Sequence, residues 1–337
     1  MLLFGCFQAK KWLGCLLLLV LAVYLIAICR VPVKRFFYGV KKDVTYLGTD
    51  MSGLLKEEVY EIVRKSAGRY FSQPVNAVAD DVWAHGMIPE LFGYELEIDE
   101  TVDKILEAAE GRQVSPEINI IKPEKTLAGA SKKVVYRGNP GKTQAAFMIN
   151  VAWENEYLPD VLAVLAQEKV KATFFLVGRW AEQNEGLVMD ILNAGHEIAS
   201  HGFDDGIVMQ GLSREKAYAD IKKSLDIIEN ITNCKVAYFT PHKGEFDEVT
   251  VSICSQLGLS LIMWSLDTAD WLGLEVEDML SRTVEKVFNG AIILMHPTAK
   301  SGSYLQEALP LIKGKGLEVV TISELLNPDW LKRGDSK

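Results

Sequence analysis

The sequence predicts an α/β protein: a distorted (β/α)7 barrel, preceded by a small α+β domain and an N-terminal transmembrane helix. From Ala145 onward, seven apolar strand-like runs alternate with helical patterns, which is the order of a parallel sheet. Histidine and carboxylate side chains follow several of these runs directly, and barrel enzymes build their sites at the carboxyl ends of strands. A long apolar run without charges near the N-terminus predicts the transmembrane helix.

The transmembrane helix is predicted from Trp12 to Cys29, which contain no charged residue and are rich in Leu, Val, Ile and Ala. This length just spans the hydrocarbon layer as a helix. A signal peptide has a shorter apolar region and ends at a small-residue cleavage site, which Ile28 before Cys29 does not offer. We therefore predict an uncleaved single-pass membrane anchor within residues 1–35.

Charge and cysteine content limit the partners. The formal net charge of -9 argues against nucleic acid, and it also means that attachment to an anionic membrane must be hydrophobic. Basic residues after the anchor outnumber those before it, which favours a cytoplasmic C-terminal side. Of the five cysteines, only Cys234 and Cys254 lie beyond the anchor region, and they lack a metal-binding spacing. We expect two free buried thiols and no disulfide framework.

Residues 44–123 predict a small α+β accessory domain. Val59, Ile62 and Val63 follow helical spacing, and Asp99 can cap a second helix. The order of these segments resembles a domain type found beside bacterial cell-wall enzymes, which implies contact with peptidoglycan; the alternative is a spacer between barrel and membrane.

A largely polar stretch that carries Gly138, Pro140 and Gly141, residues 124–143, predicts a linker. Residues 144–327 form the barrel domain and 328–337 a tail. Ser213 is predicted to cap the helix that contains Ala217 and Ile221. The seven predicted strands are 145–151, 172–176, 197–200, 236–239, 259–264, 291–295 and 317–322.

The carboxyl ends of these strands collect side chains suited to chemistry. Three of the five histidines lie there. This clustering favours a functional site over chance placement. The residues at the strand ends are Asn150, Val151, Trp153, His201, Asp204, Asp205, Thr240, Pro241, His242, Asp267, Asp270, Trp271 and His296.

Four motifs resemble the polysaccharide deacetylase family, also called the NodB homology domain or carbohydrate esterase family 4. They are residues 171–178, 195–198, 263–271 and 293–296, within a resemblance that covers about residues 145–326. The resemblance implies removal of acetyl groups from N-acetylated sugars of chitin, peptidoglycan or related glycans, with a divalent metal. It also implies a metal held by one aspartate and two histidines, a second aspartate as general base, and a histidine that protonates the leaving amine.

The family pattern is incomplete in this sequence. Asn150 stands at the position of the base and Val151 at the position of the metal-binding aspartate. An amide cannot take a proton from water, and an isopropyl group cannot coordinate a metal. His201 keeps one ligand position, while Asp205 replaces the second histidine. The remaining catalytic positions are matched by Asp267, Asp270, Trp271 and His296, and Thr240 replaces an arginine.

The implied site has two alternatives. In a working hydrolase of non-peptide carbon–nitrogen bonds, His201 and Asp205 hold a divalent metal, zinc by preference, with Asp204, His242, Glu154 or water completing the shell. Glu154 or Glu156 then serves as base. In a glycan-binding or scaffolding pseudoenzyme, Trp153, Trp271 and Trp180 offer apolar faces to the sugar, and Pro241 contacts it. We further expect His196 to be structural, His85 and His242 to lie at the surface, and Trp264 to belong to the core.

The start of the barrel domain, Asn150-Val-Ala-Trp153, resembles a sporulation-associated branch of the family. Most family members act outside the cytoplasmic membrane, and we therefore expect extracytoplasmic domains despite the charge count around the anchor. The sequence thus predicts a membrane-anchored member of the family, directed at N-acetylated cell-wall glycan, with weak or no activity.

Overall fold

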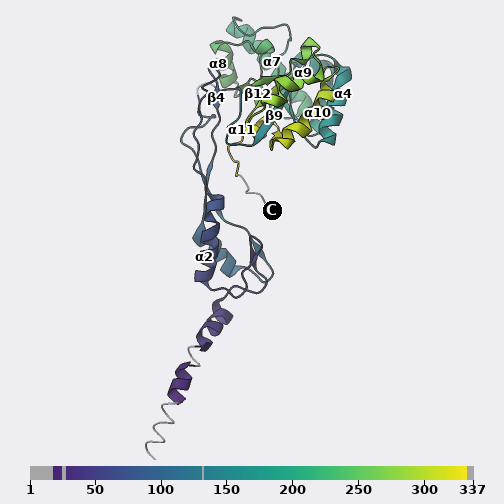
Figure 1. Cartoon of the computed structure of the whole chain (residues 1–337). Helices are drawn as coiled ribbons and strands as arrows, with labels where there is room; N and C mark the ends of the chain where they lie inside the picture. The colour runs from purple at the N-terminus through teal and green to yellow at the C-terminus, as the bar shows by residue number, and fades with distance from the viewer. Residues whose placement is uncertain (1–17, 25–27, 131–132, 332–337) are drawn as a thin grey trace, which may run out of the picture. The chain divides into compact units, whose positions relative to one another are not determined.

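The computed structural model describes residues 18–24, 28–130 and 133–331 of the 337-residue chain. It contains two compact units, and each is built from separate pieces of the sequence (Figure 1). The smaller unit combines the described residues up to Gln73 with Gly93–Ile121. The larger unit combines Pro74–Phe92 with the described residues from Lys122 onward.

The smaller unit pairs two amphipathic helices, both of which the sequence predicted. Val59 and Val63 of one helix and Val102 and Ile105 of the other are completely buried in one apolar cluster. The carboxylate of Glu58 accepts the backbone N–H of Leu55 at 2.9 Å, which closes the start of the first helix. Its elements are β1 (Thr45–Tyr46), β2 (Thr49–Asp50), α2 (Lys56–Ser66), the 3-10 turn η1 (Ala67–Tyr70), β5 (Gly93–Leu96), α3 (Ile98–Glu107), β6 (Gln113–Val114) and β7 (Ile118–Ile121).

Half of the predicted anchor from Trp12 to Cys29 falls outside the described residues. Residues 18–24 and 28–38 are helical. Within the described part of the chain, no helix has both the length and the apolar character needed to cross a bilayer.

A curled parallel sheet forms the centre of the larger unit. The strand order is β14-β15-β9-β10-β11-β12-β13-β8, with β16 also paired to β9, and every pairing between these strands is parallel. The strands are β8 (Val134–Val135), β9 (Gln144–Val151), β10 (Thr173–Leu176), β11 (Glu197–Ser200), β12 (Tyr238–Phe239), β13 (Ser260–Ile262), β14 (Leu266–Asp267), β15 (Ile292–Met295) and β16 (Glu318–Val320). All seven predicted strands occur, with small shifts at their ends, and the open curl fits the predicted barrel class.

The register brings the carboxyl ends of four strands to one level. Val151 lies opposite Leu176, Leu176 opposite Ser200, and Ser200 opposite Phe239. The segments that follow these strands therefore meet at one edge of the sheet, which is where the candidate site lies.

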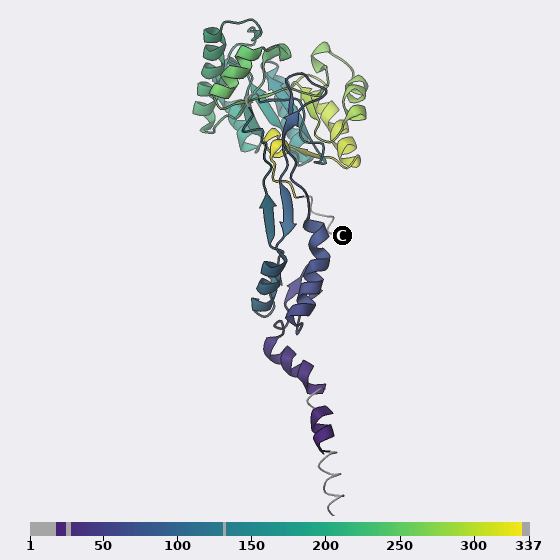
Figure 2. The same ribbon diagram turned by 90° about the vertical axis from the view of Figure 1, so that its left-hand side faces the viewer.

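Side chains of β9 alternate between two apolar clusters, as the period of a strand requires. Phe147, Ile149 and Val151 belong to the larger cluster, whereas Ala146 and Met148 belong to a smaller one. Figure 2 shows the helices grouped around the sheet. The helices and 3-10 turns are η2 (Asn155–Tyr157), α4 (Leu158–Gln167), α5 (Gly178–Gln183), α6 (Glu185–Asn193), α7 (Arg214–Thr232), η3 (His242–Gly244), α8 (Glu248–Gln256), η4 (Asp270–Leu272), α9 (Val276–Arg282), η5 (Val284–Lys286), α10 (Ser301–Gly314) and α11 (Ile322–Leu326).

Helix α11 is fixed by a buried lysine. The ammonium group of Lys142 donates to the carbonyl oxygens of Glu324 at 2.5 Å, Leu325 at 3.1 Å and Asn327 at 3.0 Å. These carbonyls lie at the C-terminal end of the helix, where the regular helical N–H donors run out. Ser213 caps α7 as predicted, accepting the N–H of Lys216 at 3.4 Å.

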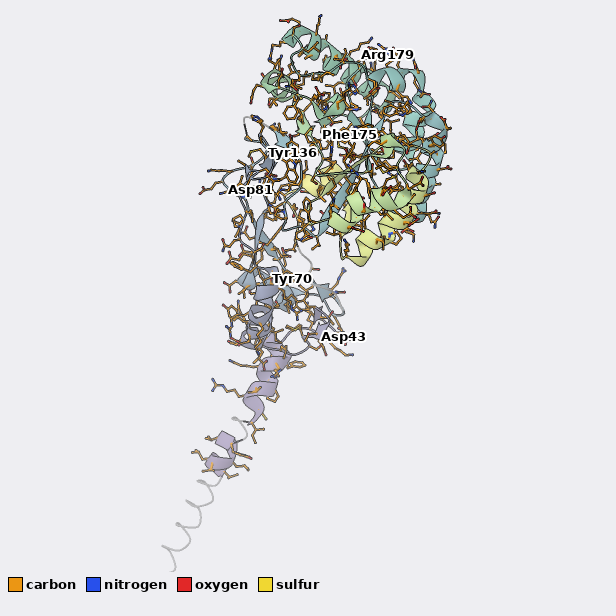
Figure 3. The ribbon with its side chains drawn as sticks, turned by 45° about the horizontal axis from the view of Figure 1, so that its top comes forward. Asp43, Tyr70, Asp81, Tyr136, Phe175 and Arg179 are labelled. Carbon is orange, nitrogen blue, oxygen red and sulfur yellow. The ribbon has the colours of Figure 1, made fainter. Side chains whose placement is uncertain are left out.

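The structure divides the predicted accessory domain between the two units, and the predicted linker contains a strand of the central sheet. Residues 74–92, which contain β3 (Val78–Ala79) and β4 (Met87–Ile88), group with the larger unit. Asp80 has no exposed side-chain surface and accepts from Arg137 Nε at 2.8 Å. Within the expected linker, 124–143, strand β8 pairs with β13. Figure 3 labels Asp81 and Tyr136, which belong to these two segments, and Phe175, which is completely buried in the larger unit.

Candidate active site

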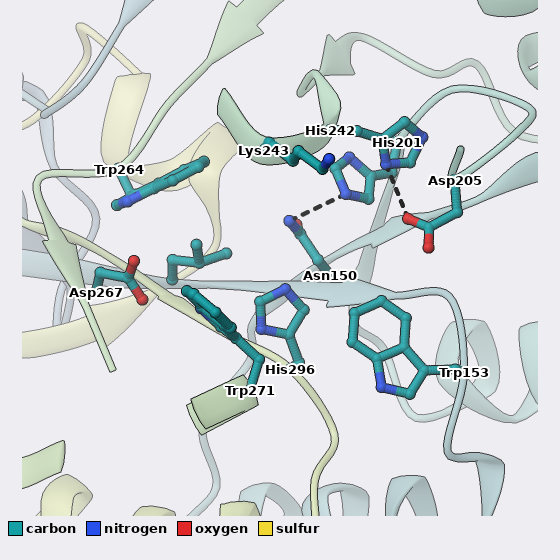
Figure 4. A pocket seen from close by; sticks show the side chains of 11 residues that line it. Asn150, Trp153, His201, Asp205, His242, Lys243, Trp264, Asp267, Trp271 and His296 are labelled. Atoms are coloured by element: carbon teal, nitrogen blue, oxygen red, sulfur yellow. Dashed lines mark hydrogen bonds and ion pairs between the residues drawn. The ribbon is translucent and has the colours of Figure 1, made fainter. Parts of the chain in front are cut away.

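A pocket of about 580 Å³ opens at the carboxyl ends of the strands (Figure 4). Asn150 lies at its centre, with two groups of side chains facing one another across it. One group contains His296 and the other contains His201, His242 and Asp205. The lining residues are Asn150, Trp153, His201, Asp205, His242, Lys243, Trp264, Asp267, Trp271, Leu294 and His296.

The first group is a histidine–aspartate pair. His296 follows β15, and its Nδ1 lies 2.9 Å from Oδ1 of Asp270. Oδ2 of the same carboxylate accepts the backbone N–H of His296 at 2.6 Å. Trp153 stacks on the imidazole, with 5.4 Å between ring centroids. The pair is therefore held rigidly, and the second ring nitrogen of His296 remains available to a ligand, as an acid catalyst requires.

Asp267 lines the pocket from β14. Burial raises the pKa of its carboxyl above the usual value. Its Oδ1 accepts the backbone N–H of Ala269 at 2.8 Å, which fixes the turn that leads to Asp270. The structure thus brings Asp267, Asp270, Trp271 and His296 to one side, where the sequence predicted them.

The second side contains the altered family positions. Asn150 is buried, its Nδ2 lies 3.3 Å from Nε2 of His201, and its Oδ1 makes no hydrogen bond. Val151 is completely buried in the larger apolar cluster and is absent from the pocket lining. The strand therefore turns the amide toward the site and the isopropyl group away from it.

His201 presents an unprotonated nitrogen to the pocket. Its Nδ1 lies 2.9 Å from the carbonyl oxygen of Thr240, and a carbonyl can only accept, so Nδ1 carries the proton. Burial, together with neighbouring His242, lowers the pKa of His201 well below its usual value. The ring is neutral at pH 7, and the lone pair of Nε2, which accepts from Nδ2 of Asn150, is the one that can serve as a metal ligand.

His242 is buried, and the expectation that it lies at the surface is wrong. The left-handed conformation of Lys243, with φ of 59°, curls the turn so that the preceding imidazole faces inward. Its ring lies 4.0 Å from that of His201, between centroids, and its Nδ1 lies 3.0 Å from Oδ1 of Asp205. Neither ring nitrogen makes a hydrogen bond.

Several predicted contributors lie outside the pocket lining. Asp204 pairs with Arg179 at 2.5 Å, and neither Glu154 nor Glu156 lines the pocket. Pro241 is buried beside His242 without lining the pocket. Trp180 is also buried and absent from the lining, and its Nε1 donates to Oδ1 of Asn155 at 2.6 Å.

Three lining residues were not predicted as site residues, and one of them is Leu294 of β15. Trp264, expected in the core, is half-buried and lines the pocket, as does the exposed side chain of Lys243. Both lie close to strand ends, and that position is the signal that identifies them.

A curled parallel sheet with a histidine–aspartate pair and a histidine–carboxylate cluster at its strand ends is the arrangement that the polysaccharide deacetylase motifs predicted. The family model for polysaccharide deacetylase matches residues 137–262. The chain is 34% identical over 272 residues to the uncharacterized protein YlxY of Bacillus subtilis, covering 81% of this chain and 84% of that protein. The chain belongs to the polysaccharide deacetylase family, as its motifs predicted.

Two further relatives carry functional descriptions. A Bacillus cereus peptidoglycan-N-acetylglucosamine deacetylase is 27% identical over 197 residues, covering 56% of this chain and 70% of that enzyme. The crystal structure of BA3943, a carbohydrate esterase family 4 pseudoenzyme from Bacillus anthracis, has a TM-score of 0.70 and 34% identity, covering 80% of this chain and 95% of that structure. A mutant of BA3943 is described as having restored enzymatic activity.

The family's metal ligand set does not fit the residues present. Its aspartate position holds Val151, which has no donor atom and packs in the apolar cluster. Only His201 is retained, and Asp205 occupies the other histidine position. No catalytic step can therefore be routed through a metal held in the family manner.

Proposed function

We propose that this chain is a membrane-anchored protein that binds N-acetylated cell-wall glycan in the pocket and hydrolyses it weakly or not at all. One observation carries the proposal. The pocket keeps the His296–Asp270 pair and exposed tryptophan faces, while the base position holds Asn150, a buried amide. The groups that contact sugar are thus present, and the group that would activate water is absent.

The missing base has a predictable cost. Hydrolysis of an acetamide requires a group that takes the proton from the attacking water, and loss of such a base costs about 10²–10⁴-fold in rate. The amide oxygen of Asn150 instead offers an unpaired acceptor inside the pocket. Such an oxygen can accept a hydrogen bond from a sugar hydroxyl or from the N–H of an acetamido group.

The aromatic side chains support a carbohydrate ligand. Trp153 is 39% exposed and Trp271 is 58% exposed, and both line the same pocket. Apolar surface gathered in one groove is typical of a binding site. Indole rings present flat apolar faces with a polar edge, which match the C–H faces and hydroxyl groups of a pyranose. The peptidoglycan deacetylases among the relatives favour cell-wall glycan as the ligand class.

Membrane attachment rests on the uncharged apolar run from Trp12 to Cys29. We place the folded units on the extracytoplasmic side, in the cell envelope or around the spore, because that is where cell-wall glycan is found. The smaller unit then contacts peptidoglycan or spaces the larger unit from the membrane.

The proposal is tested with the full chain, purified in detergent, and N-acetylglucosamine oligomers. We expect the chain to retain the oligomers in a pull-down and to release no stoichiometric acetate. Trp271→Ala should weaken retention, whereas His85→Ala, at an exposed loop position, should leave it unchanged. Acetate release that His201→Ala abolishes would establish a working hydrolase instead. Failure to retain any glycan would remove the binding function.

A further inference from the structure

Three side chains in the pocket converge without satisfying one another. His201, Asp205 and His242 each offer a donor atom, and these atoms all lie within 4.8 Å of one another. The His242 ring is 2% exposed; its Nδ1 lies 3.0 Å from Oδ1 of Asp205 without hydrogen-bond geometry, and its Nε2 has no hydrogen-bond partner. Buried polar groups without partners are rare in folded proteins, and one explanation is an ion that the group coordinates.

The surroundings of each ring determine which atom is directed at the cluster. His201 uses Nδ1 for the carbonyl of Thr240, so Nε2 is the nitrogen with a lone pair. This nitrogen accepts from Nδ2 of Asn150 at 3.3 Å, a contact that an ion would replace. In His242, Nε2 faces Gly202: a Cβ added at Gly202 would lie 3.3 Å from this nitrogen and 2.8 Å from Oδ2 of Asp220. Nδ1 of His242 therefore faces the carboxylate of Asp205, at 3.0 Å.

The loop that carries Asp205 is held from helix α7. Asp220 accepts the backbone N–H of Phe203 at 2.9 Å and that of Asp204 at 3.2 Å. Gly202 begins this loop with φ of +79°, a conformation that favours glycine. Ligands on such a fixed loop need little reorganisation when an ion binds.

We propose that the chain binds one zinc ion through Nε2 of His201, the carboxylate of Asp205 and Nδ1 of His242. Two imidazoles and a carboxylate are the ligand types of zinc sites that keep an open fourth position. The ligands follow β11 and β12, so the ion lies beside these strands and needs nothing from Val151 on β9. This ligand set differs from that of the family, which takes no ligand from the segment that contains His242.

Bound there, zinc supplies an electrophilic position for an oxygen atom of the glycan. Zinc binding is a property in addition to glycan binding, and it can be measured in the absence of glycan. Failure of one proposal leaves the other testable: glycan retention is measured in EDTA, and zinc binding in the absence of sugar.

The test is zinc titration of the full chain after removal of metals with EDTA, by calorimetry and elemental analysis. We expect one zinc ion per chain. His242→Ala and Asp205→Asn should each weaken binding by at least the ~10–100-fold that changes around a metal site typically cost. His85→Ala should bind zinc as the wild type does, because this exposed imidazole lies outside the cluster.

Two readouts keep the test decisive. Asp205 is 53% exposed at its side chain, so Asp205→Asn removes the charge without disturbing the core. Cobalt substitution should give visible d–d bands without a thiolate charge-transfer band, which excludes binding by cysteines. The proposal is overturned if the wild type binds no stoichiometric zinc, or if both folded variants bind it with unchanged affinity.

Discussion

Asn150 and Val151 are neighbours in sequence, yet the strand assigns them to different environments. Adjacent residues of a strand face opposite sides; here Asn150 lines the pocket and Val151 packs in the larger apolar cluster. Changing Asn150 and Val151 to the aspartates of the family should therefore affect stability differently. An aspartate replaces Asn150 with the same shape, whereas an aspartate at position 151 places a charge among apolar side chains.

Restoring the family residues should create deacetylase activity. The triple variant Asn150→Asp, Val151→Asp, Asp205→His regains a base and three family ligands, and we expect zinc-dependent acetate release from N-acetylglucosamine oligomers. Because a base contributes about 10²–10⁴-fold, the variant that keeps Asn150 but carries the other two changes should be slower by that factor. Equal rates for the two variants would show that Asn150 does not limit catalysis.

The restored variant should also depend on metal for its stability. Without an ion, the carboxylate at position 151 has no partner among the surrounding apolar groups, and the thermal midpoint should fall below that of the wild type. Zinc should recover part of this loss. A midpoint that does not respond to zinc would mean that the new ligands do not meet.

The two cysteines of the larger unit should react differently. Burial raises the pKa of Cys254 to about 12, so its thiolate is scarce at neutral pH. Cys234 is exposed, contrary to the expectation of two buried thiols. Iodoacetamide should modify Cys234 in the native chain and reach Cys254 only after denaturation, as measured by peptide mass spectrometry. Equal labelling of both native thiols would contradict this assignment.

Sequence motifs located the His296–Asp270 pair because both residues lie in motifs that resemble those of the family, at strand ends. His242 was misjudged, since a Pro-His-Lys turn is usually solvated and nothing local reveals that Lys243 adopts a left-handed conformation. The inward curl of that turn depends on packing against β11 and its loop. Such contacts join residues distant in sequence, which local patterns do not encode.

At the scale of elements, β11 begins with a buried histidine whose role is structural. The backbone N–H of Ala172 donates to Nδ1 of His196 at 3.2 Å, and Phe174 packs against the ring at 5.1 Å between centroids. Burial, assisted by the positive charge of Lys171, lowers the pKa of His196 to about 4. The imidazole is neutral at pH 7. Protonation of its Nδ1 would place a second N–H against the backbone N–H of Ala172.

Acid should therefore loosen this element. Between pH 6.5 and 4 the unfolded chain binds a proton that folded His196 refuses, so the free energy of unfolding falls as the pH drops through this window. His196→Gln, whose carbonyl oxygen can accept the same bond, should show a shallower decline in denaturation curves at a series of pH values. A decline as steep as that of the wild type would show that other groups control it.

The strands that the sequence missed, β8 and β14, contain two residues each. An alternating or continuous apolar pattern cannot be recognised over two residues, and only pairing with β13 and β15 defines them. The longer strands were found because a buried parallel sheet needs continuous apolar runs. The linker was misassigned for the same reason, because the strand that it contains is short and lies among glycines and a proline.

At the scale of the whole molecule, the two units have separate apolar cores. Ile105 is completely buried in the core of the smaller unit, and Ile105→Ala should destabilise that unit by about 2–5 kcal/mol. Calorimetry of the full chain should show one transition shifted and the other unchanged. Ile191→Ala, in the larger unit, is the matched control and should shift the other transition. A single transition that moves with both variants would indicate one cooperative unit.

The interleaving of the two units has a consequence for the order of synthesis. Every described piece of the smaller unit has been translated once Ile121 leaves the ribosome, whereas Pro74–Phe92 must wait for partners such as Arg137 and Pro328. Chains grow at about 5–20 residues per second, slowly enough for the smaller core to close first. Residues 74–92 then lie between a unit that has folded and one that is still being synthesised. If synthesis ends soon after Ile121, the released chain has a folded smaller unit and an exposed segment without its partners.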